Sequence, residues 1–314
     1  MKTVLLTGAT GFVGRIVARR LSERGYHIRA VSRRPETGVA GAAEVVALPD
    51  DPTAKEAWLP LLAGVDLVVH CAGIAHATGA IARETYFAAN AALTGALAEA
   101  AFKATSGRFI FLSSIRAVTG ATHDGTVTDE TPPRPQDDYG RSKLEGERRV
   151  VETFGDSGRF AILRPVLIYG PQAKGNLAAL ARLAALPVPL PIAGLKAPRS
   201  LLDVASLADA ILFLLERPQI APGPFLVCDR NAMGVADIVS AFRNGRGRRS
   251  PLFSLPDALL SAPLRLAGRG EDWRRLTGPL VADAEGLEAL GWRPAEDTAA
   301  RIAAYARAER KDPA

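Results

Sequence analysis

A tyrosine and a lysine four residues apart stand near the middle of the chain, in Tyr139-Gly140-Arg141-Ser142-Lys143. In a helix, side chains at positions i and i+4 share one face, so these two would be neighbours. An ammonium beside a phenol favours the phenolate and lowers the pKa of the tyrosine, which makes it a usable proton donor or acceptor. The spacing therefore predicts acid–base chemistry, with a surface pair of no catalytic role as the alternative.

A glycine-rich turn stands at the start of the chain, in KTVLLTGATGFVG. The pattern predicts a buried strand, a turn and a helix that opens near Phe12. Gly8 permits the sharp turn, Gly11 lacks the Cβ that would hold a diphosphate away from the backbone, and Gly14 lets the helix approach the strand closely. Because the first-turn N–H groups of such a helix suit an anion, we expect a bound dinucleotide here, with a plain structural turn as the alternative.

The end of the second expected strand, at Ser32, Arg33 and Arg34, selects between two dinucleotides. An acidic residue there would bind the ribose hydroxyl of NAD, whereas basic residues would accommodate the 2′-phosphate of NADP. The absence of an acid favours NADP(H), and NAD(H) is possible if the arginines are only solvated loop residues. Asp50 or Asp51, after the third strand, could reach the adenine edge, although an acid before a proline is equally a turn former.

Strand and helix patterns alternate from residue 1 to about residue 118. Apolar strands separated by helices predict a parallel sheet covered on both faces, and with the glycine turn first they predict a doubly wound α/β fold of the Rossmann type. We expect residues 1–170 to bind the dinucleotide and residues 171–314 to form a smaller, mostly helical substrate-binding region, with residues 199–230 returning to the first part. The expected strands are 4–6, 27–31, 44–48, 65–71, 109–112 and 225–228, and the main expected helices are 14–24, 54–62, 84–103 and 204–215.

Composition narrows the class of protein. The 314 residues are 48% hydrophobic and carry a net charge of +6, which indicates a basic globular enzyme whose ligands carry phosphates. The basic run at residues 243–249 has no interleaved aromatics, so we expect no nucleic-acid partner. Cys71 and Cys228 are interpreted as reduced core residues, and we expect no metal, no membrane span and a cytoplasmic location. The histidines, His27, His70, His76 and His123, show no metal-ligand spacing, and His76 is interpreted as a loop residue.

Six motifs follow one another in a set order: TGATGFVG, HCAG at residues 70–73, YFAAN ending at Asn90, FLSS, YGRSK and RPVLIYGP. On these motifs the chain resembles the extended short-chain dehydrogenase/reductases, the NAD-dependent epimerase/dehydratase family, over nearly its whole length. The runs GRFIFLSSIRAV, DDYGRSK, RSLLDV and LGWRP resemble the nucleotide-sugar 4-keto-reductases of surface-polysaccharide pathways, often labelled UDP-glucose 4-epimerase-like. Two stretches depart from the family pattern, VTG at 118–120 in place of a VYG turn and LPD at 48–50 in place of Gly-Asp.

The resemblance implies catalytic roles. Tyr139 would donate or accept the proton, and Lys143 would hold the nicotinamide ribose and lower the pKa of Tyr139. Ser114, preferred to Ser113 because of its position in the loop, would hydrogen-bond the reacting sugar oxygen.

The resemblance also implies binding residues. Asn176 would contact the nucleotide base or diphosphate of the substrate, with a helix N-cap as the alternative. Arg199 would contact the substrate diphosphate, with a surface arginine as the alternative. The cofactor would be bound by Gly8, Thr10, Gly11, Phe12, Val13, Gly14, Ser32, Arg33, Arg34, Asp50, Cys71, Ala72, Gly73, Asn90, Tyr139, Lys143 and Pro165.

We therefore expect an NAD(P)-dependent oxidoreductase that reduces the 4-keto group of a nucleoside-diphosphate sugar, of the UDP-4-keto-6-deoxy-N-acetylhexosamine type. The first alternative is a 4-epimerase that retains NAD, and the second is a non-catalytic dinucleotide-binding scaffold, a class that usually lacks the Tyr–Lys pair. Arg33 and Arg34 favour NADPH and hence the reductase, because a net reductase exchanges its cofactor at each turnover. The resemblance also implies a homodimer, formed through helices near residues 84–103 and 144–154.

Overall fold

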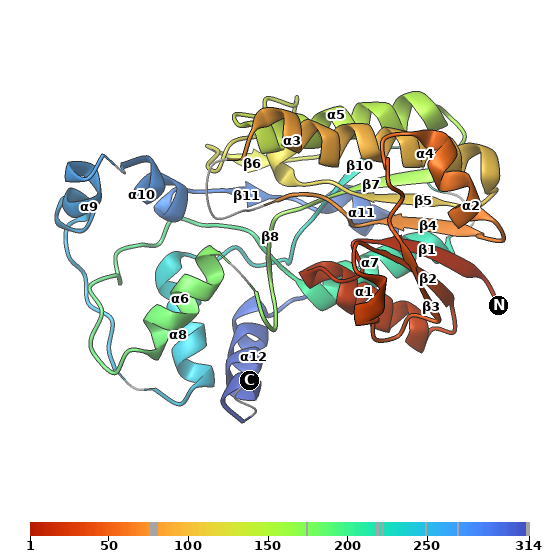
Figure 1. The fold of residues 1–314 in the computed structure, drawn as a ribbon. Helices are drawn as coiled ribbons and strands as arrows, with labels where there is room; N and C mark the ends of the chain where they lie inside the picture. The colour runs from red at the N-terminus through yellow and green to blue at the C-terminus, as the bar shows by residue number, and fades with distance from the viewer. Residues whose placement is uncertain are drawn as a thin grey trace.

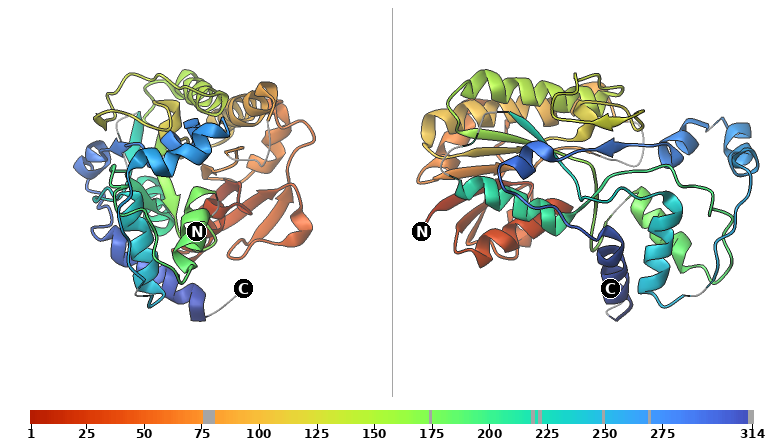
Figure 2. Two further views of the ribbon diagram at one scale, coloured as in Figure 1. Left: turned by 90° about the vertical axis from the view of Figure 1, so that its left-hand side faces the viewer. Right: turned by 180° about the vertical axis from the view of Figure 1, so that it is seen from behind.

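A seven-stranded parallel sheet forms the centre of the computed structural model (Figures 1 and 2). The strand order β10-β7-β5-β4-β1-β2-β3 shows that the chain starts in the middle of the sheet and winds to both edges. In such a sheet the crevice at the carboxyl ends of the strands is where ligands bind. The strands are β1 (Thr3–Thr7), β2 (His27–Ser32), β3 (Glu44–Ala47), β4 (Leu67–His70), β5 (Phe109–Leu112), β7 (Phe160–Pro165) and β10 (Pro224–Val227).

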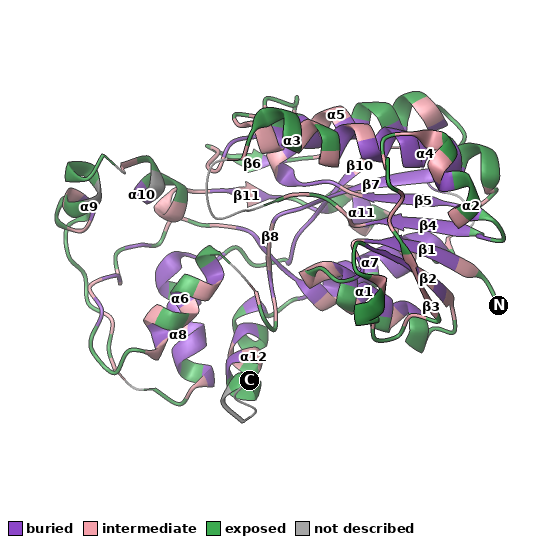
Figure 3. Ribbon diagram, in the orientation of Figure 1, coloured by how far each residue is buried: buried purple, intermediate pink, exposed green. Residues whose placement is uncertain are grey.

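Helices cover both faces of this sheet, with α1 and α7 on one side and α2, α4 and α5 on the other (Figure 1). Side chains alternate between the two faces along β1, so that Val4 and Leu6 belong to one core cluster and Leu5 to the other. Figure 3 shows the buried sheet between helices whose outer faces are exposed. These helices are α1 (Phe12–Glu23), α2 (Leu59–Leu62), α3 (Arg83–Phe87), α4 (Leu93–Ala104), α5 (Asp138–Phe154) and α7 (Val204–Glu216).

A smaller, mostly helical part extends beyond the carboxyl edge of the sheet, to the left in Figure 1. A third core cluster joins α6, α8 and α12 around Phe242 and Ile302. Two small parallel pairs, β8 with β9 and β6 with β11, lie between the two parts. The bounds are β6 (Thr126–Val127), β8 (Leu167–Tyr169), α6 (Asn176–Ala185), β9 (Leu201–Asp203), α8 (Val235–Gly245), α9 (Asp257–Leu266), α10 (Gly270–Thr277), β11 (Val281–Ala282), α11 (Glu285–Ala289) and α12 (Thr298–Lys311).

The structure describes residues 1–75, 81–173, 175–217, 220, 223–248, 250–268 and 270–311. The loop position predicted for His76 lies outside these residues, as does part of the basic run at 243–249. The predicted Rossmann fold class is confirmed, and β10, within residues 199–230, pairs with β7 in the main sheet.

Two expected helices are not continuous. Residues 54–62 form a 3₁₀ turn (Lys55–Trp58) before α2, which has Pro60 in its first turn, a position that suits a residue without an N–H. The helix expected at 84–103 contains a π-helical turn at Ala88–Ala92. Within it the carbonyl of Asn90 accepts a hydrogen bond from Thr94 Oγ1 at 2.9 Å, and π turns are frequent at functional sites.

A buried carboxylate joins the C-terminal helix α12 to the rest of the fold. Asp203, which is 0% exposed, accepts hydrogen bonds from Tyr305 at 2.7 Å and from the backbone N–H of Ala205 at 3.0 Å. Its second oxygen lies 2.5 Å from Arg301. This one side chain therefore caps α7 and holds two residues of α12.

We predict that Asp203→Ala lowers the free energy of unfolding by about 3 kcal/mol, because it leaves a half-buried tyrosine, an arginine and an N–H group in the first turn of α7 without their buried acceptor. Urea unfolding followed by circular dichroism measures the loss. The control is Asp209→Ala, also on α7, whose carboxylate is 52% exposed and lies 3.5 Å from Arg20, and which should change the free energy by less than about 0.5 kcal/mol. Equal effects of the two substitutions would contradict this account of α12.

Candidate functional site

The glycine turn after β1 is closely packed on both sides. Gly8 has a φ of +72°, and a Cβ added to it would lie 2.6 Å from the backbone nitrogen of Ala72 at the end of β4. A Cβ on Gly14 would lie 2.0 Å from the carbonyl oxygen of Gly8. These two positions therefore require glycine, and they bring the first turn of α1 to the carboxyl edge of the sheet.

The first turn of α1 suits the diphosphate of a dinucleotide. The N-cap residue is Gly11, which has no side chain to cap the helix, and the first turn contains no acid. Backbone N–H groups and the helix dipole both favour an anion at such a helix start. Thr10 is exposed, while Phe12 and Val13 are half-buried beside it, so these residues fit the cofactor role expected of them.

The other expected cofactor residues follow the carboxyl ends of neighbouring strands. Ser32 ends β2 and is buried, and its Oγ accepts a hydrogen bond from the N–H of Arg34 at 3.0 Å. Arg33 and Arg34 are exposed directly beyond it. Asp50 is exposed a few residues after β3, and Pro165 is buried at the end of β7.

The helix α5 presents the Tyr–Lys pair to the same edge. Its N-cap is Asp137, whose side chain accepts a hydrogen bond from the N–H of Gly140 at 2.8 Å. Arg116, in the loop after β5, lies 2.5 Å from the second oxygen of Asp137. The start of α5 is therefore tied to the loop that carries Ser114.

Tyr139 is hydrogen-bonded to the side chain of Ser114. Burial raises the pKa of Tyr139 above its usual value, and the hydrogen bond from Ser114 and the charge of Arg116 oppose that rise. The pKa of Tyr139 is therefore raised on balance in this structure, whereas the sequence analysis expected it to be lowered. Burial is the largest influence on this pKa, although the residue as a whole is half-buried.

The two serines at the end of β5 have different partners. Ser113 Oγ donates to Glu147 Oε1 at 2.5 Å, so its hydroxyl is engaged within the protein. Ser114 contacts Tyr139 and also accepts from the N–H of Arg116 at 3.2 Å. This geometry supports the choice of Ser114 over Ser113 as the group that meets a reacting oxygen.

Lys143 is only 4% exposed. Its Nζ donates to the carbonyl of Leu112 at 2.7 Å and lies 4.5 Å from the centre of the Phe111 ring. Burial lowers the pKa of Lys143 to about 8, while the charge of Glu147 opposes that shift. A Cβ on Gly73 would lie 3.4 Å from Nζ, so the loop after β4 adjoins the lysine.

Asn90 connects that loop to α5. Its side-chain Nδ2 donates to the carbonyl of Ile74 at 3.0 Å and to Ser142 Oγ at 3.0 Å, while Oδ1 accepts from the N–H of Ile74 at 2.8 Å. Ser142 Oγ in turn donates to the carbonyl of Tyr139 at 2.8 Å. The amide of Asn90 is thus occupied in positioning the site, and a direct cofactor contact from it stays a prediction.

A histidine that the sequence analysis did not assign to the site lies beneath it. His70 Nε2 lies 2.9 Å from Thr94 Oγ1, which donates its own hydrogen to Asn90, so the imidazole is the donor there. Its Nδ1 therefore accepts from Thr7 Oγ1 at 2.6 Å. Burial lowers the pKa of His70 to about 3, which makes it a neutral link between β1, β4 and α4. The HCAG motif placed it at a strand end, but only the structure shows its partners.

The side chain of Cys71 is a free thiol at this edge of the sheet. Burial raises its pKa to about 12, so it stays a neutral thiol next to Lys143. Together with Ala72 it supplies the backbone against which Gly8 packs.

The two expected substrate residues lie in different settings. Arg199 is half-buried and donates to the carbonyls of Ala121 and Gly278 at 3.1 Å and 2.5 Å. Ala121 lies in the segment between β5 and α5, so Arg199 is attached to the stretch of chain that also carries Ser114. Asn176 is exposed at the first position of α6, where Gly175 is the N-cap, so the alternative that Asn176 caps this helix is wrong.

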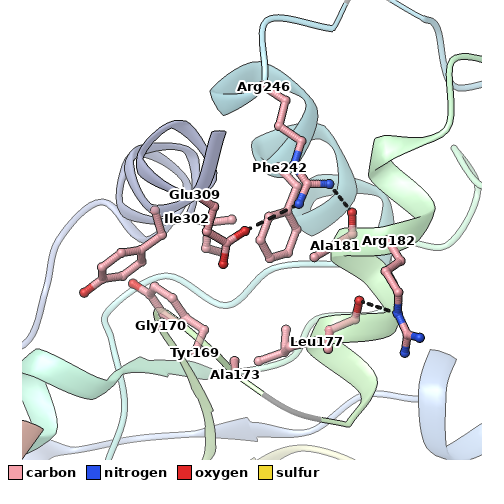
Figure 4. A pocket seen from close by; sticks show the side chains of 12 residues that line it. Tyr169, Gly170, Ala173, Leu177, Ala181, Arg182, Phe242, Arg246, Ile302 and Glu309 are labelled. Atoms are coloured by element: carbon pink, nitrogen blue, oxygen red, sulfur yellow. Dashed lines mark hydrogen bonds and ion pairs between the residues drawn. The ribbon is translucent and has the colours of Figure 1, made fainter. Parts of the chain in front are cut away.

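A cavity of about 210 Å³ lies elsewhere, between α6, α8 and α12 (Figure 4). Its wall is largely apolar, with Leu177, Phe242 and Ile302 facing it, and Arg246 and Glu309 form an ion pair at 3.5 Å on its rim. Ser114, Tyr139 and Lys143 do not line it. The candidate catalytic group therefore lies apart from this cavity.

Within the described residues, no group of three or more His, Cys, Asp or Glu side chains could hold a metal ion. None of the helices in these ranges combines the length and hydropathy needed to cross a bilayer.

Comparison with known proteins agrees with the fold and identifies the family. The model of the NAD dependent epimerase/dehydratase family matches residues 4–228, and the chain belongs to this family. A relative from Vibrio cholerae, a UDP-glucose 4-epimerase, is 34% identical over 93% of this chain and 91% of its own length.

Solved structures share the fold. A UDP-N-acetylglucosamine 4-epimerase from Bacillus cereus superposes with a TM-score of 0.73 over 99% of this chain and 100% of its own, at 19% identity. A UDP-glucuronic acid 4-epimerase from the same organism, in complex with NAD, gives a TM-score of 0.73 over 98% and 97%, at 19% identity. At such identities the likeness establishes the architecture.

Proposed function

We propose that this protein is an NADP(H)-dependent reductase of the 4-keto group of a nucleoside-diphosphate sugar, of the UDP-4-keto-6-deoxy-N-acetylhexosamine type. In net terms one ketone, one NADPH and one proton give one secondary alcohol and one NADP⁺. The observation that carries this choice is the exposed pair Arg33 and Arg34 after Ser32, with no acid at the end of β2. Guanidinium groups there suit the 2′-phosphate that distinguishes NADPH from NADH.

The residues of the chain handle the proton and the developing charge. When bound, the nicotinamide supplies the hydride. Ser114 holds the ketone oxygen as it gains negative charge, and Tyr139 donates the proton to it. Because the pKa of Tyr139 lies above its usual value, the phenol carries its proton at neutral pH and has one to donate. Lys143 would hold the nicotinamide ribose and present its charge to the same edge.

Arg199 and Asn176 are proposed to bind the substrate. Arg199 uses two of its N–H groups on backbone carbonyls, and a guanidinium has five, so donors remain for a diphosphate. Asn176 is exposed at the start of α6 and could reach a base or phosphate.

The second candidate is 4-epimerisation with a retained NAD. The observation that favours it is the likeness, over nearly the whole chain, to a Vibrio cholerae UDP-glucose 4-epimerase. The same residues would act, but Tyr139 would first have to accept the hydroxyl proton. An epimerase does not release its cofactor at each turnover, so a preference for NADPH would be of no use to it.

The purified protein should oxidise NADPH stoichiometrically when it is given a UDP-linked 4-keto-6-deoxy-N-acetylhexosamine made in the same vessel by a dehydratase. NADH should be a much poorer donor, and Arg33→Ser/Arg34→Ser should reduce the ratio of kcat/KM for NADPH over NADH at least about 10-fold, because each lost phosphate contact costs about 1 kcal/mol or more. Absorbance at 340 nm gives the rates.

If the protein leaves NADPH unchanged and purifies with a bound dinucleotide, the reductase is wrong. Interconversion of UDP-N-acetylglucosamine and UDP-N-acetylgalactosamine without added cofactor would then identify the epimerase.

A non-catalytic scaffold makes a different prediction for Tyr139→Phe. An enzyme should lose about 100-fold or more in kcat, because the proton donor is gone, while cofactor affinity changes little. Ser114→Ala should lower kcat by about 10-fold or more, whereas Ser113→Ala, at the neighbouring serine whose hydroxyl is bound to Glu147, should have a smaller effect on kcat. If neither Tyr139→Phe nor Ser114→Ala changes the turnover rate, a catalytic role for this group is contradicted.

Three wider expectations stay predictions. We propose the division into a dinucleotide-binding part and a substrate-binding region near residue 170, and a homodimer that uses the outer faces of α4 and α5. Action in the cytoplasm on the precursors of a surface polysaccharide follows only from the family resemblance.

A further inference from the structure

We propose that Glu147 and Arg164 are positioning residues for the candidate catalytic group. Their buried ion pair fixes α5 against the ends of β5 and β7 and keeps a negative charge beside Lys143. The effect on turnover rests on the proposed function, whereas the effect on Lys143 itself does not.

The pair is a closed, buried unit. Arg164, on β7, donates to both oxygens of Glu147, from Nη2 at 2.6 Å and from Nε at 3.0 Å. The two side chains are only 5% and 4% exposed. Ser113 Oγ adds a third donor to Glu147 at 2.5 Å. Three elements, α5, β5 and β7, therefore meet at one carboxylate.

The position of Glu147 on α5 relates it to the chemistry. Tyr139, Lys143 and Glu147 follow one another at four-residue spacing, so they occupy neighbouring places along one helix face. Rotation or sliding of α5 would have to break the two hydrogen bonds between Arg164 and Glu147. The pair also fixes Ser113, and through the backbone the adjacent Ser114, relative to Tyr139.

The groups around Lys143 show what the charge of Glu147 does. From β4 and the loop after it come His70, which is neutral, and Cys71, a neutral thiol. From β5 come the Phe111 ring and the Leu112 carbonyl. Glu147 is therefore the nearby full negative charge that opposes the burial of the ammonium.

The groups around Glu147 are Lys143 on its own helix, Arg164 on β7 and the hydroxyl of Ser113 on the turn after β5. Arg164 also lowers the pKa of Asp129, a carboxyl whose pKa is raised to about 6, chiefly by burial. One guanidinium thus serves two carboxylates, and Glu147 is the one bound to it by paired hydrogen bonds.

The test is Glu147→Gln, which keeps the shape and the acceptor oxygen but removes the charge. A lysine is charged below its pKa. Loss of the Glu147 carboxylate removes the charge that opposes the effect of burial, so the pKa of Lys143 falls further. The alkaline limb of the kcat–pH profile should therefore move to lower pH by about one unit. Glu145→Gln, at a half-buried position of the same helix where Glu145 pairs with Arg149 at 3.2 Å, should leave the profile unchanged.

A second readout does not need turnover. The chain has seven lysines, so a protein labelled with ¹³C and ¹⁵N in lysine gives a sparse NMR spectrum in which Lys143→Arg identifies the Lys143 signal. Its titration should give a pKa near 8 in the parent protein and about one unit lower in Glu147→Gln. An unchanged Lys143 pKa in a folded Glu147→Gln variant overturns the inference.

The two readouts separate the inference from the proposed reaction. A shifted Lys143 pKa in a protein that does not reduce the keto sugar supports the positioning pair and contradicts only the proposed function. If Glu147→Gln fails to fold, Glu147→Gln/Arg164→Gln removes both charges together, and a smaller lowering of the Lys143 pKa is expected, because a positive charge is lost with the negative one. If that double variant keeps the full rate and the alkaline limb of its kcat–pH profile does not move, the inference is overturned as well.

Discussion

A lysine ammonium withdrawn from water is costly unless its hydrogens and its charge are both satisfied, and Lys143 is 4% exposed. Several elements of the structure together supply the groups that surround this ammonium. A carbonyl and an aromatic ring come from β5, a carboxylate from the next turn of α5, and the backbone of the loop after β4 lies against the ammonium. These elements must end at the same edge of the sheet, which a parallel doubly wound order provides.

The same requirement explains the polar residues beneath the site. The hydrogen-bond series from Thr7 through His70, Thr94 and Asn90 to Ser142 crosses from β1 to α5, and it contains no charge because the pKa of His70 is held near 3. A neutral, fully paired series can be buried without the penalty of an isolated ion. It therefore fixes the geometry around Tyr139 without adding a charge to those of Lys143, Glu147, Arg164 and Arg116.

Much of this could be predicted from the sequence, for physical reasons. The glycine turn, the apolar strands and the Tyr–Lys spacing are local features, so the strand 109–112 and the opening of α1 at Phe12 follow from neighbouring residues alone. The partners of Glu147 and His70 could not be predicted, because β5, β7 and α4 meet only in three dimensions, although the four-residue spacing from Lys143 to Glu147 was a usable signal. The pKa of Tyr139 was predicted in the wrong direction because a spacing argument contains no measure of burial.

The central claim is that this edge of the sheet delivers a hydride from exchangeable NADPH to the 4-carbon of a sugar. NADPH deuterated on the transferred face of its nicotinamide tests it most directly, with the product analysed by mass spectrometry and NMR. The account predicts one deuterium per product molecule, located at C4, at a rate that Tyr139→Phe abolishes. Product formed without deuterium from the added NADPH would contradict it, since the hydride would then come from a cofactor that never leaves the protein.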